Sequence, residues 1–388
     1  MWRRCFSQAW VQWTRTLAAA LVGAIVPAAF AFAVEPPTDL LASDSPPAPS
    51  AWERAFTLKA GLGYKDNLTL APQARESSPF VASTVEAFAL RRSENGDQLM
   101  GLATLEDNRY WSGKTVDHED LAIAQGEWRR FWANDWQAAL GLEGIYIDQV
   151  VDLSVTETNR QALPVRGWTL TARPGTRREL SGPTWLALEL PVTRQLYDGS
   201  LDDFWEVGPK VLLGHDLGDR IETSISYAFT HRGYDSEPGR DASGAAVTNT
   251  VRAAAQHDVI GGWKHYWDAA RRWRTATKLG YRHSADNLSG YFDYERYSVS
   301  QEIRFQTTAW ELSAEARLSS YRYPVQTVSD TDPSKRRRAD LTLSLRSERQ
   351  VAKHVRLYAQ YDYERTDSNA ALDEYTVNTV SGGVAVEF

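Results

Sequence analysis

The chain has 388 residues, of which 43% are hydrophobic and 24% are charged. This balance excludes a disordered chain and a bundle of membrane-spanning helices. The net charge of -7 at pH 7 is opposite in sign to that of a protein that binds nucleic acid without sequence preference. The length would ordinarily indicate more than one domain, but a β-barrel of this size forms a single domain.

Residues 1–33 have the pattern of a secretory signal peptide. Arginines precede an apolar run that ends in Ala31-Phe32-Ala33, the small residues at alternate positions that a signal peptidase recognises. Removal of this segment takes away three arginines and no acidic residue, so the net charge of -7 becomes -10. It also removes Cys5, the only cysteine, so the mature chain is expected to hold no disulfide and no cysteine-bound metal.

Residues 34–54 are rich in proline, and we predict an extended periplasmic arm there. From residue 55 to residue 388 apolar and polar residues alternate, as in strands with one apolar face. Leu312, Ala314, Ala316 and Leu318, for example, alternate with polar or charged residues. The alternating stretches run to roughly ten residues or more, which is the length that a tilted membrane-spanning strand needs and exceeds the usual strand of a soluble protein.

The links between these stretches alternate in length. Working back from the C-terminus, short links are predicted at Gln350 to Lys353, Gln306 to Thr308, Asp268 to Arg271, Asp216 to Asp219, Arg173 to Gly182, Ala133 to Asp135 and Ser93 to Asp97. The other set, often longer, is Asn369 to Asp373, Pro324 to Arg336, Ser284 to Gly290, Asp235 to Thr250, Asp198 to Asp203, Asp148 to Leu163, Ser112 to Glu119 and Asp66 to Ser78. Short periplasmic turns and longer outer loops are typical of outer-membrane barrels.

The pattern therefore predicts an all-β fold, a transmembrane antiparallel up-and-down β-barrel of about sixteen strands with both ends in the periplasm. Counts of fourteen or eighteen strands stay open, because Pro191 and Pro209 fall inside proposed strands and remove a ladder donor there. A soluble all-β protein is the competing fold.

Aromatic residues cluster at the ends of the proposed strands. Beside the short links lie Trp132, Trp136, Trp185, Trp267, Trp273 and Trp310. Toward the other ends lie Tyr64, Tyr146, Tyr197, Trp205, Tyr234, Tyr281, Tyr291 and Tyr361. Aromatic girdles at the two interfaces of a bilayer account for this placement.

The last nine residues end in a strand pattern that stops on an aromatic residue. The segment resembles the C-terminal assembly signal of bacterial outer-membrane proteins, carried here by Ser381, Gly383, Val386 and Phe388. The resemblance implies recognition by the barrel assembly machinery.

A second resemblance lies near the start of the barrel. The stretch Gly61-Leu62-Gly63-Tyr64-Lys65-Asp66-Asn67-Leu68, followed by a strand ending Phe88-Ala89-Leu90-Arg91-Arg92, resembles the opening of a group of bacterial β-barrel porins. It is also similar to the barrels of proteins that help surface lipoprotein or exopolysaccharide reach the cell surface. Those relatives often carry a helical-repeat periplasmic domain, and we expect none before the barrel here.

Signals for chemistry are weak. The seven histidines show no metal-ligand spacing, and no cofactor motif is present, so no metal and no cofactor are expected. Asp117-His118 would suit an Asp-His protease and His283-Ser284 a lipid hydrolase, but neither lies in the motif of such enzymes. We expect no catalytic residues.

Charged residues of the proposed strands share the polar parity that would face a lumen. The predicted pore-lining residues are Arg274, Lys278, Arg282, Arg296, Arg304, Glu311, Glu315, Arg317, Asp340, Arg346, Arg356 and Asp362. Two interpretations stay open: an arginine strip that gives the pore a transverse field, or salt bridges that stiffen the wall.

The sequence thus favours a barrel in the outer membrane of a Gram-negative bacterium that passes small hydrophilic solutes. Export or assembly of surface polysaccharide or lipoprotein is the alternative, and an outer-membrane hydrolase is a third hypothesis. Expected partners are outer-membrane lipid and lipopolysaccharide, whose phosphates the run Lys335-Arg336-Arg337-Arg338 would meet unless it is a plain solvated loop.

Overall fold

A computed structural model describes residues 52–73, 75–93, 96–132, 135–155, 162–199, 201–329 and 331–388. The first strand begins at Trp52. The predicted signal peptide, residues 1–33, and the predicted arm up to residue 51 lie outside these residues. None of the described helices is long and apolar enough to cross a membrane.

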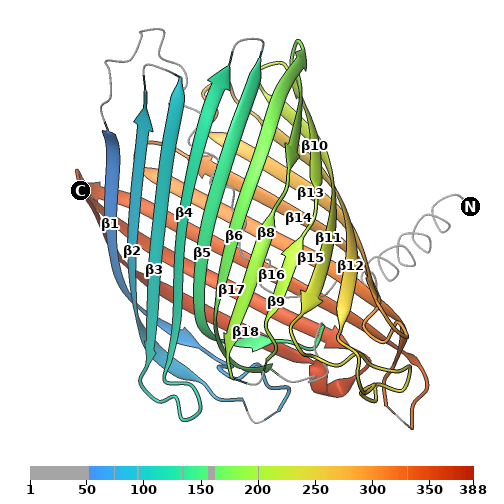
Figure 1. The fold of residues 1–388 in the computed structure, drawn as a ribbon. Helices are drawn as coiled ribbons and strands as arrows, with labels where there is room; N and C mark the ends of the chain where they lie inside the picture. The colour runs from blue at the N-terminus through green and yellow to red at the C-terminus, as the bar shows by residue number, and fades with distance from the viewer. Residues whose placement is uncertain are drawn as a thin grey trace, which may run out of the picture.

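The chain forms one closed antiparallel β-barrel with strongly tilted strands (Figure 1). The strand segments are β1 (Trp52–Lys65), β2 (Ser78–Arg92), β3 (Asp97–Tyr110), β4 (His118–Trp132), β5 (Trp136–Asp152), β6 (Ala162–Ser181), β7 (Thr184–Glu189), β8 (Val192–Asp198), β9 (Phe204–Val207), β10 (Lys210–Leu217), β11 (Ile221–Tyr234), β12 (Ala253–Tyr266), β13 (Trp273–Asp286), β14 (Tyr294–Gln306), β15 (Trp310–Thr327), β16 (Lys335–Ala352), β17 (Val355–Ser368) and β18 (Tyr375–Glu387). A short 3-10 helix, η2 (Ala371–Asp373), lies between the last two strands.

The wall has sixteen strands, because two of them are interrupted. β7 and β8 both pair with β6, and β9 and β10 both pair with β11. The interruptions fall at Pro191 and Pro209, as expected for a residue that cannot donate to the ladder. Their carbonyl groups still accept, from the N–H of Gly208 at 3.3 Å and of Phe229 at 3.0 Å. The predicted sixteen-strand barrel is confirmed.

One predicted turn was wrong. The Arg173 to Gly182 stretch is not a link, because β6 continues through it to Ser181 and the turn lies at residues 182–183. Pro174 sits inside this strand without breaking it, since its carbonyl accepts from Leu190 at 2.9 Å and its partner on β5 is Leu140. A single lost donor costs too little to end a strand that pairs continuously with β5 from Ala162 to Arg178.

The first and last strands close the barrel. β18 pairs with β1 over a register that places Gly383 opposite Gly61. A Cβ at Gly383 would clash with the Ala60 carbonyl, and one at Gly61 would clash with the ring of Tyr358. The two glycines therefore allow the closing strands to approach each other and the Tyr358 side chain to lie against Gly61.

The two ends of the barrel differ, as the link lengths predict. Both chain ends of the wall lie on the side of the short turns, whereas the longer loops gather at the other end, at the bottom of Figure 1. We call these the turn end and the loop end. In outer-membrane barrels they correspond to the periplasm and the outside.

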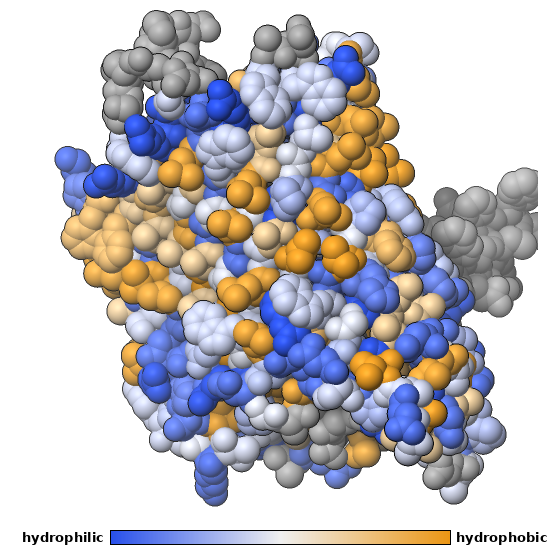
Figure 2. All heavy atoms as spheres, viewed as in Figure 1, coloured by the Kyte–Doolittle hydropathy of each residue, from blue (hydrophilic) through white to orange (hydrophobic). Residues whose placement is uncertain are grey.

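The outer surface is apolar across the middle of the wall. Along β5 the outward residues include Leu140 and Leu142, which are 39% and 53% exposed. Figure 2 shows hydrophobic residues through the middle of this face and frequent hydrophilic residues toward the loop end. An apolar band on a closed barrel is the surface that a bilayer covers, so the fold is that of an outer-membrane barrel.

Most of the predicted girdle residues lie on the outer surface. At the turn end Trp132, Trp136, Trp267, Trp273 and Trp310 are each at least 38% exposed. Trp185 departs from the prediction, because it shares the inward face with Gly214 and stacks on Arg177 at 4.1 Å.

Two predicted members of the outer girdle were also wrong. Tyr197 and Tyr234 take the inward parity of their strands and pack beside Phe204, with ring centroids at 6.2 and 5.3 Å. Buried packing inside the loop end replaces the interfacial position that the sequence suggested for them.

Candidate functional site: the lumen and its outer mouth

The twelve predicted pore-lining residues share the inward face of β13 to β17. The cross-strand register places Arg282 opposite Arg296, and Arg317 opposite Thr342. The neighbouring positions on the same strands, such as Leu279 and Leu345, are 60% and 41% exposed on the apolar outer face. The period-2 pattern thus separates a charged inner wall from an apolar outer one.

Most inward arginines pair within the wall. The N–O distances are 2.6 Å for Arg274 and Glu302, 2.7 Å for Arg282 and Asp258, 2.7 Å for Arg304 and Glu311, 3.4 Å for Arg317 and Glu315, and 3.0 Å for Arg356 and Glu387. Arg346 pairs with Glu348, and Arg296 reaches Asp258 at 3.8 Å. These contacts favour the interpretation in which cross-strand and same-strand ion pairs stiffen the wall.

Lys278 differs from these arginines. It points inward between Gly262 and Ser300 and is exposed, and it makes no ion pair with any residue in the described part of the chain. Glu106 on β3 and Arg317 on β15 are also inward and exposed. Charged side chains that remain exposed inside a closed ring show an interior with room for water, as expected at sixteen strands.

Reversing the charge of Lys278 is expected to change ion selectivity. Lys278→Glu places a carboxylate where the wall offers an uncompensated cation, so the permeability ratio of K+ over Cl- should rise by about twofold or more. The measurement is the reversal potential in a salt gradient. Lys210→Gln is the matched control, because Lys210 is also inward but already paired with Glu189 at 3.0 Å. An unchanged reversal potential in Lys278→Glu would show that this lysine does not face the path of the ions.

At the loop end the described residues that follow β5 reach across the lumen to the far wall. We call these residues and the last residue of β5, Asp152 to Val155, the crossing tip. Asp152 binds Arg338 of β16 at 2.6 Å, although six other strands separate β5 from β16 along the shorter way around the barrel. Val155 is 1% exposed and packs against Tyr294, Tyr321 and Tyr323 of the far wall.

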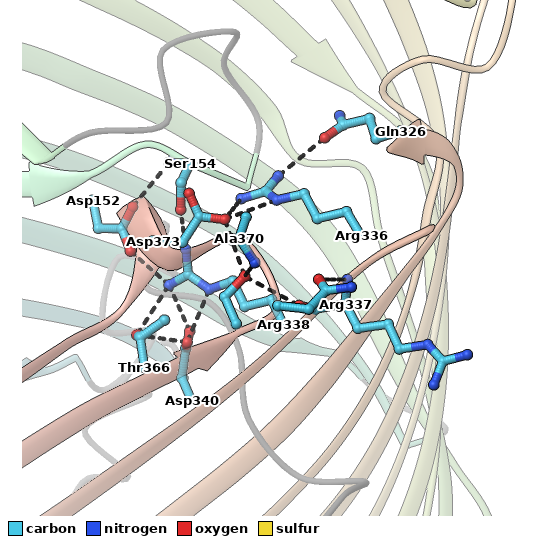
Figure 3. A network of polar contacts seen from close by, with 12 residues as sticks. Asp152, Ser154, Gln326, Arg336, Arg337, Arg338, Asp340, Thr366, Ala370 and Asp373 are labelled. Carbon is cyan, nitrogen blue, oxygen red and sulfur yellow. Dashed lines mark hydrogen bonds and ion pairs between the residues drawn. The ribbon is translucent and has the colours of Figure 1, made fainter. Parts of the chain in front are cut away.

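On the far wall the crossing tip contacts a buried polar network, shown in Figure 3. Arg338 also forms two 2.9 Å bonds to Asp340 and donates to the hydroxyl groups of Ser154 and, at 3.3 Å, Thr366. Thr366 donates to Asp340 at 2.7 Å, and the N–H of Ser154 donates to Asp152 at 2.9 Å. Every member thus has a charged or hydroxyl partner, which a buried guanidinium requires.

Arg336, two residues earlier on β16, anchors a second outer segment. Its side chain is fully buried and donates to Asp373 of η2 at 2.7 and 2.9 Å and to Gln326 at 3.1 Å. Gln326 in turn donates to the carbonyl of Tyr291 in the loop between β13 and β14, at 2.8 Å. Arg336 and Arg338 therefore gather the loops of the outer mouth onto one strand.

An apolar cluster covers the near side of the mouth. Ile145 and Ile147 face inward from β5 and pack with Leu153 of the crossing tip and Val165 of β6. The tip is therefore fixed by apolar contacts at its base and by the arginine network at its end. Together they narrow the lumen at the loop end.

The basic run Lys335 to Arg338 was not interpreted correctly from the sequence. It begins β16, so its members alternate: Arg336 and Arg338 are buried inside, whereas Lys335 and Arg337 are exposed. The run is thus neither a solvated loop nor a uniform surface patch. The alternation of a strand, extended four residues further toward the N-terminus, would have indicated this.

The residues considered for hydrolysis are not brought together. His118 lies on the outer face of β4, 2.6 Å from Asp117, and His283 lies on β13 beside His257. Ser284 faces the opposite side of the wall from His283 and is 3% exposed. The two pairs form no common site.

The Asp66-Asn67-Leu68 motif holds the loop end of the closing strands. Asp66 accepts two 2.7 Å bonds from the backbone and side chain of Asn378 on β18. Asn67 is fully buried and bonds the N–H and C=O of Ala71 and the C=O of Thr376, at 3.0, 2.9 and 3.1 Å. In the sequence this motif stands out only through its resemblance to other barrels; its contacts make it a clasp between β1 and β18.

The four residues of the predicted assembly signal lie on β18 and at its end. Ser381 and Gly383 face inward opposite Gly63 and Gly61, and Val386 lies opposite Leu58. The Phe388 ring lies 6.0 Å from that of Phe56, and their backbones exchange hydrogen bonds of 2.8 and 3.4 Å.

No family model matches the chain, and no curated protein sequence matches it. Among solved structures it is similar to an anion-selective porin from Comamonas acidovorans, with 11% identity, a TM-score of 0.44 and coverage of 87% of this chain and 100% of that one. OccAB1 of Acinetobacter baumannii has 8% identity, a TM-score of 0.46 and coverage of 87% and 97%. A bacterial polysaccharide outer membrane secretin has 8% identity, a TM-score of 0.42 and coverage of 86% and 98%. None of these similarities is close enough to transfer a function.

Proposed function

We propose that the protein is an outer-membrane pore for small hydrophilic solutes, with an outer mouth narrowed by the crossing tip. The observation that carries this proposal is the set of inward, exposed charged side chains, Glu106, Lys278 and Arg317, inside a closed ring. A filled barrel would bury such groups or pair them fully. The ion pairs along the rest of the inner wall stiffen the barrel and keep the lumen surface polar, so that water can wet it.

The mixed signs of the wall indicate the class of solute. Glu106 belongs to β3 and Lys278 to β13, two strands from different sides of the ring. A polar solute with hydroxyl or carboxylate groups finds hydrogen-bond donors and acceptors on both sides of the lumen. An apolar solute would displace water from the charged side chains, and neither wall would compensate for the lost hydration. Small sugars and organic acids fit this description.

Liposome swelling tests the proposal. Refolded protein in vesicles should admit monosaccharides, and the rate should fall as sugar size rises. Protein denatured by heat before reconstitution is the control. No swelling by any sugar with correctly folded protein would contradict the proposal.

Export or assembly of a surface polymer is the second candidate, and the narrowed outer mouth favours it over a permanently open pore. In that case the crossing tip keeps the barrel closed until a partner displaces it. Vesicles that stay impermeable with the native chain, but admit sugars once the contact of the tip with β16 is removed, would support this candidate.

We also propose that the terminal Phe388 acts in assembly, together with Ser381, Gly383 and Val386. The Phe388 ring contacts Phe56 at the outer surface and is itself 68% exposed, so it adds little buried area. Phe388→Ala is therefore expected to slow assembly in cells several-fold while changing the unfolding free energy of the purified barrel by less than about 1 kcal/mol. Pulse-chase gel mobility measures the first and urea unfolding the second. An equal assembly rate would refute the role.

A further inference from the structure

The outer surface near the loop end carries arginines that differ in their partners. Several of them pair with an aspartate on the same surface: Arg109 with Asp107 at 2.6 Å, Arg166 with Asp148 at 2.6 Å, Arg194 with Asp235 at 2.6 Å, and Arg365 with Asp367 at 2.7 Å. This wall therefore neutralises most of its outward cations with its own side chains.

Arg322 and Arg337 are different. They are directly opposite each other on β15 and β16, both exposed, and neither forms an ion pair with a residue that the structure describes. Like charges directly opposite across two strands repel. The ladder nevertheless holds them together, because the N–H of Arg337 donates to Asn369 at 2.8 Å and Arg322 stacks over Tyr297 at 5.8 Å. An anion placed between the two guanidinium groups would relieve the repulsion.

A hollow of about 630 Å³ adjoins this arginine pair on the outside of the barrel. Besides the two arginines it is lined by Ser320, Asp367, Asn369 and Glu374. Asp367 is occupied by Arg365, and the Asn369 amide is bonded to the backbone of Arg337 and Lys335, which leaves the Glu374 carboxylate to face a ligand. The hollow therefore offers two cations for an anion and an acceptor for hydroxyl groups, the complement of a phosphorylated sugar.

The arginine pair lies at the height in the wall where lipid head groups are expected. Ser320 lies opposite Tyr297, an outward aromatic residue 42% exposed, and Arg322 lies two residues further toward the loop end. Two residues of a tilted strand rise by about 5 Å. Interfacial aromatic rings mark the boundary of the head-group layer, so the guanidinium groups reach the phosphates just beyond it.

We propose that Arg322 and Arg337 bind a phosphate of a phosphorylated glycolipid in the outer leaflet, and that the hollow beside them receives the sugar that carries it. Arginine is the residue suited to such a contact, because its planar fork matches phosphate oxygens. The proposal rests on the outer-membrane location and is independent of the passage of solutes. It identifies the member of the basic run that meets lipid: Arg337, with Arg322 as its partner from the neighbouring strand.

The test is native mass spectrometry of the refolded full chain in detergent. It is titrated with lipid A that carries its phosphates, with the same lipid after phosphatase treatment, and with inorganic phosphate. Arg322→Gln and Arg337→Gln should each lower affinity for the phosphorylated lipid about fivefold, the effect of one basic side chain at a charged membrane surface, and the double variant more. Binding of the dephosphorylated lipid should be weaker and insensitive to either substitution.

Arg166→Gln is the matched control, because Arg166 belongs to the same rim but already has Asp148 as its partner. It should bind lipid as the native chain does. The heat-dependent gel shift of every variant must match that of the native barrel, which separates a lost site from a lost fold. Equal binding of both lipid forms, or full binding by the double variant, would overturn the proposal. If inorganic phosphate binds the arginine pair as tightly as the lipid does, the proposal that the bound phosphate belongs to a lipid would be overturned.

Discussion

Arg338→Met is expected to free the crossing tip and raise the conductance of the barrel. The native guanidinium is fully buried and joins Asp152 of the tip to Asp340 of the wall. Methionine fills a similar volume but leaves two buried carboxylates without a cation, which costs about 3 to 5 kcal/mol. The least costly response is for the tip to leave the far wall, since Asp152 then regains water.

The readouts are single-channel conductance and the free energy of unfolding in urea. Arg337→Met is the matched control: the same substitution one position away, on the exposed outer face. It should change the unfolding free energy by less than about 0.5 kcal/mol and leave conductance unaltered. If Arg338→Met conducts like the native chain and is equally stable, the tip does not depend on this network.

Asn67→Leu is expected to weaken the closure of the barrel. Asn67 satisfies three backbone groups, two on Ala71 and one on Thr376, while fully buried. Leucine would leave these groups without partners, and each buried unsatisfied group costs about 1 to 3 kcal/mol. The variant should therefore unfold at lower urea concentration and lose its compact form on unheated gels at lower temperature.

Asn287→Leu is the comparison for this experiment. Asn287 also bonds two backbone groups, the C=O of Val251 and the N–H of Ala253, at 3.0 and 2.9 Å. It is exposed, so water replaces its bonds and the expected cost is below about 1 kcal/mol. A similar loss in both variants would indicate that burial of the clasp does not matter.

The wall of the barrel was predictable because its signal is local. Alternation along each strand follows from one face meeting lipid and the other meeting polar side chains, and link lengths follow from the two sides of the membrane. Proline is the exception. Pro174 lies within a continuous strand and Pro191 lies at an interruption, although the carbonyl of each accepts a backbone hydrogen bond, so proline alone does not predict where a strand breaks.

The outer mouth could not be predicted in this way. Ser154 and Arg338 are separated by 184 residues, and no periodicity relates them. The same holds for Asp66 and Asn378, separated by 312 residues, although their motif was noticed by resemblance. Which inward cation stays free and which forms an ion pair depends on cross-strand register, and register is set by the whole ring. The alternation along a strand predicts which face of the wall a residue occupies. Which of its charged side chains form pairs depends on contacts between residues far apart in the sequence.

The most direct test of the central claim is the conductance of the refolded native chain in a planar bilayer. A water-containing lumen predicts discrete, lasting current steps whose reversal potential in a salt gradient shifts with Lys278→Glu. A bilayer that stays silent with folded native protein, and equally silent with Arg338→Met, would contradict the pore.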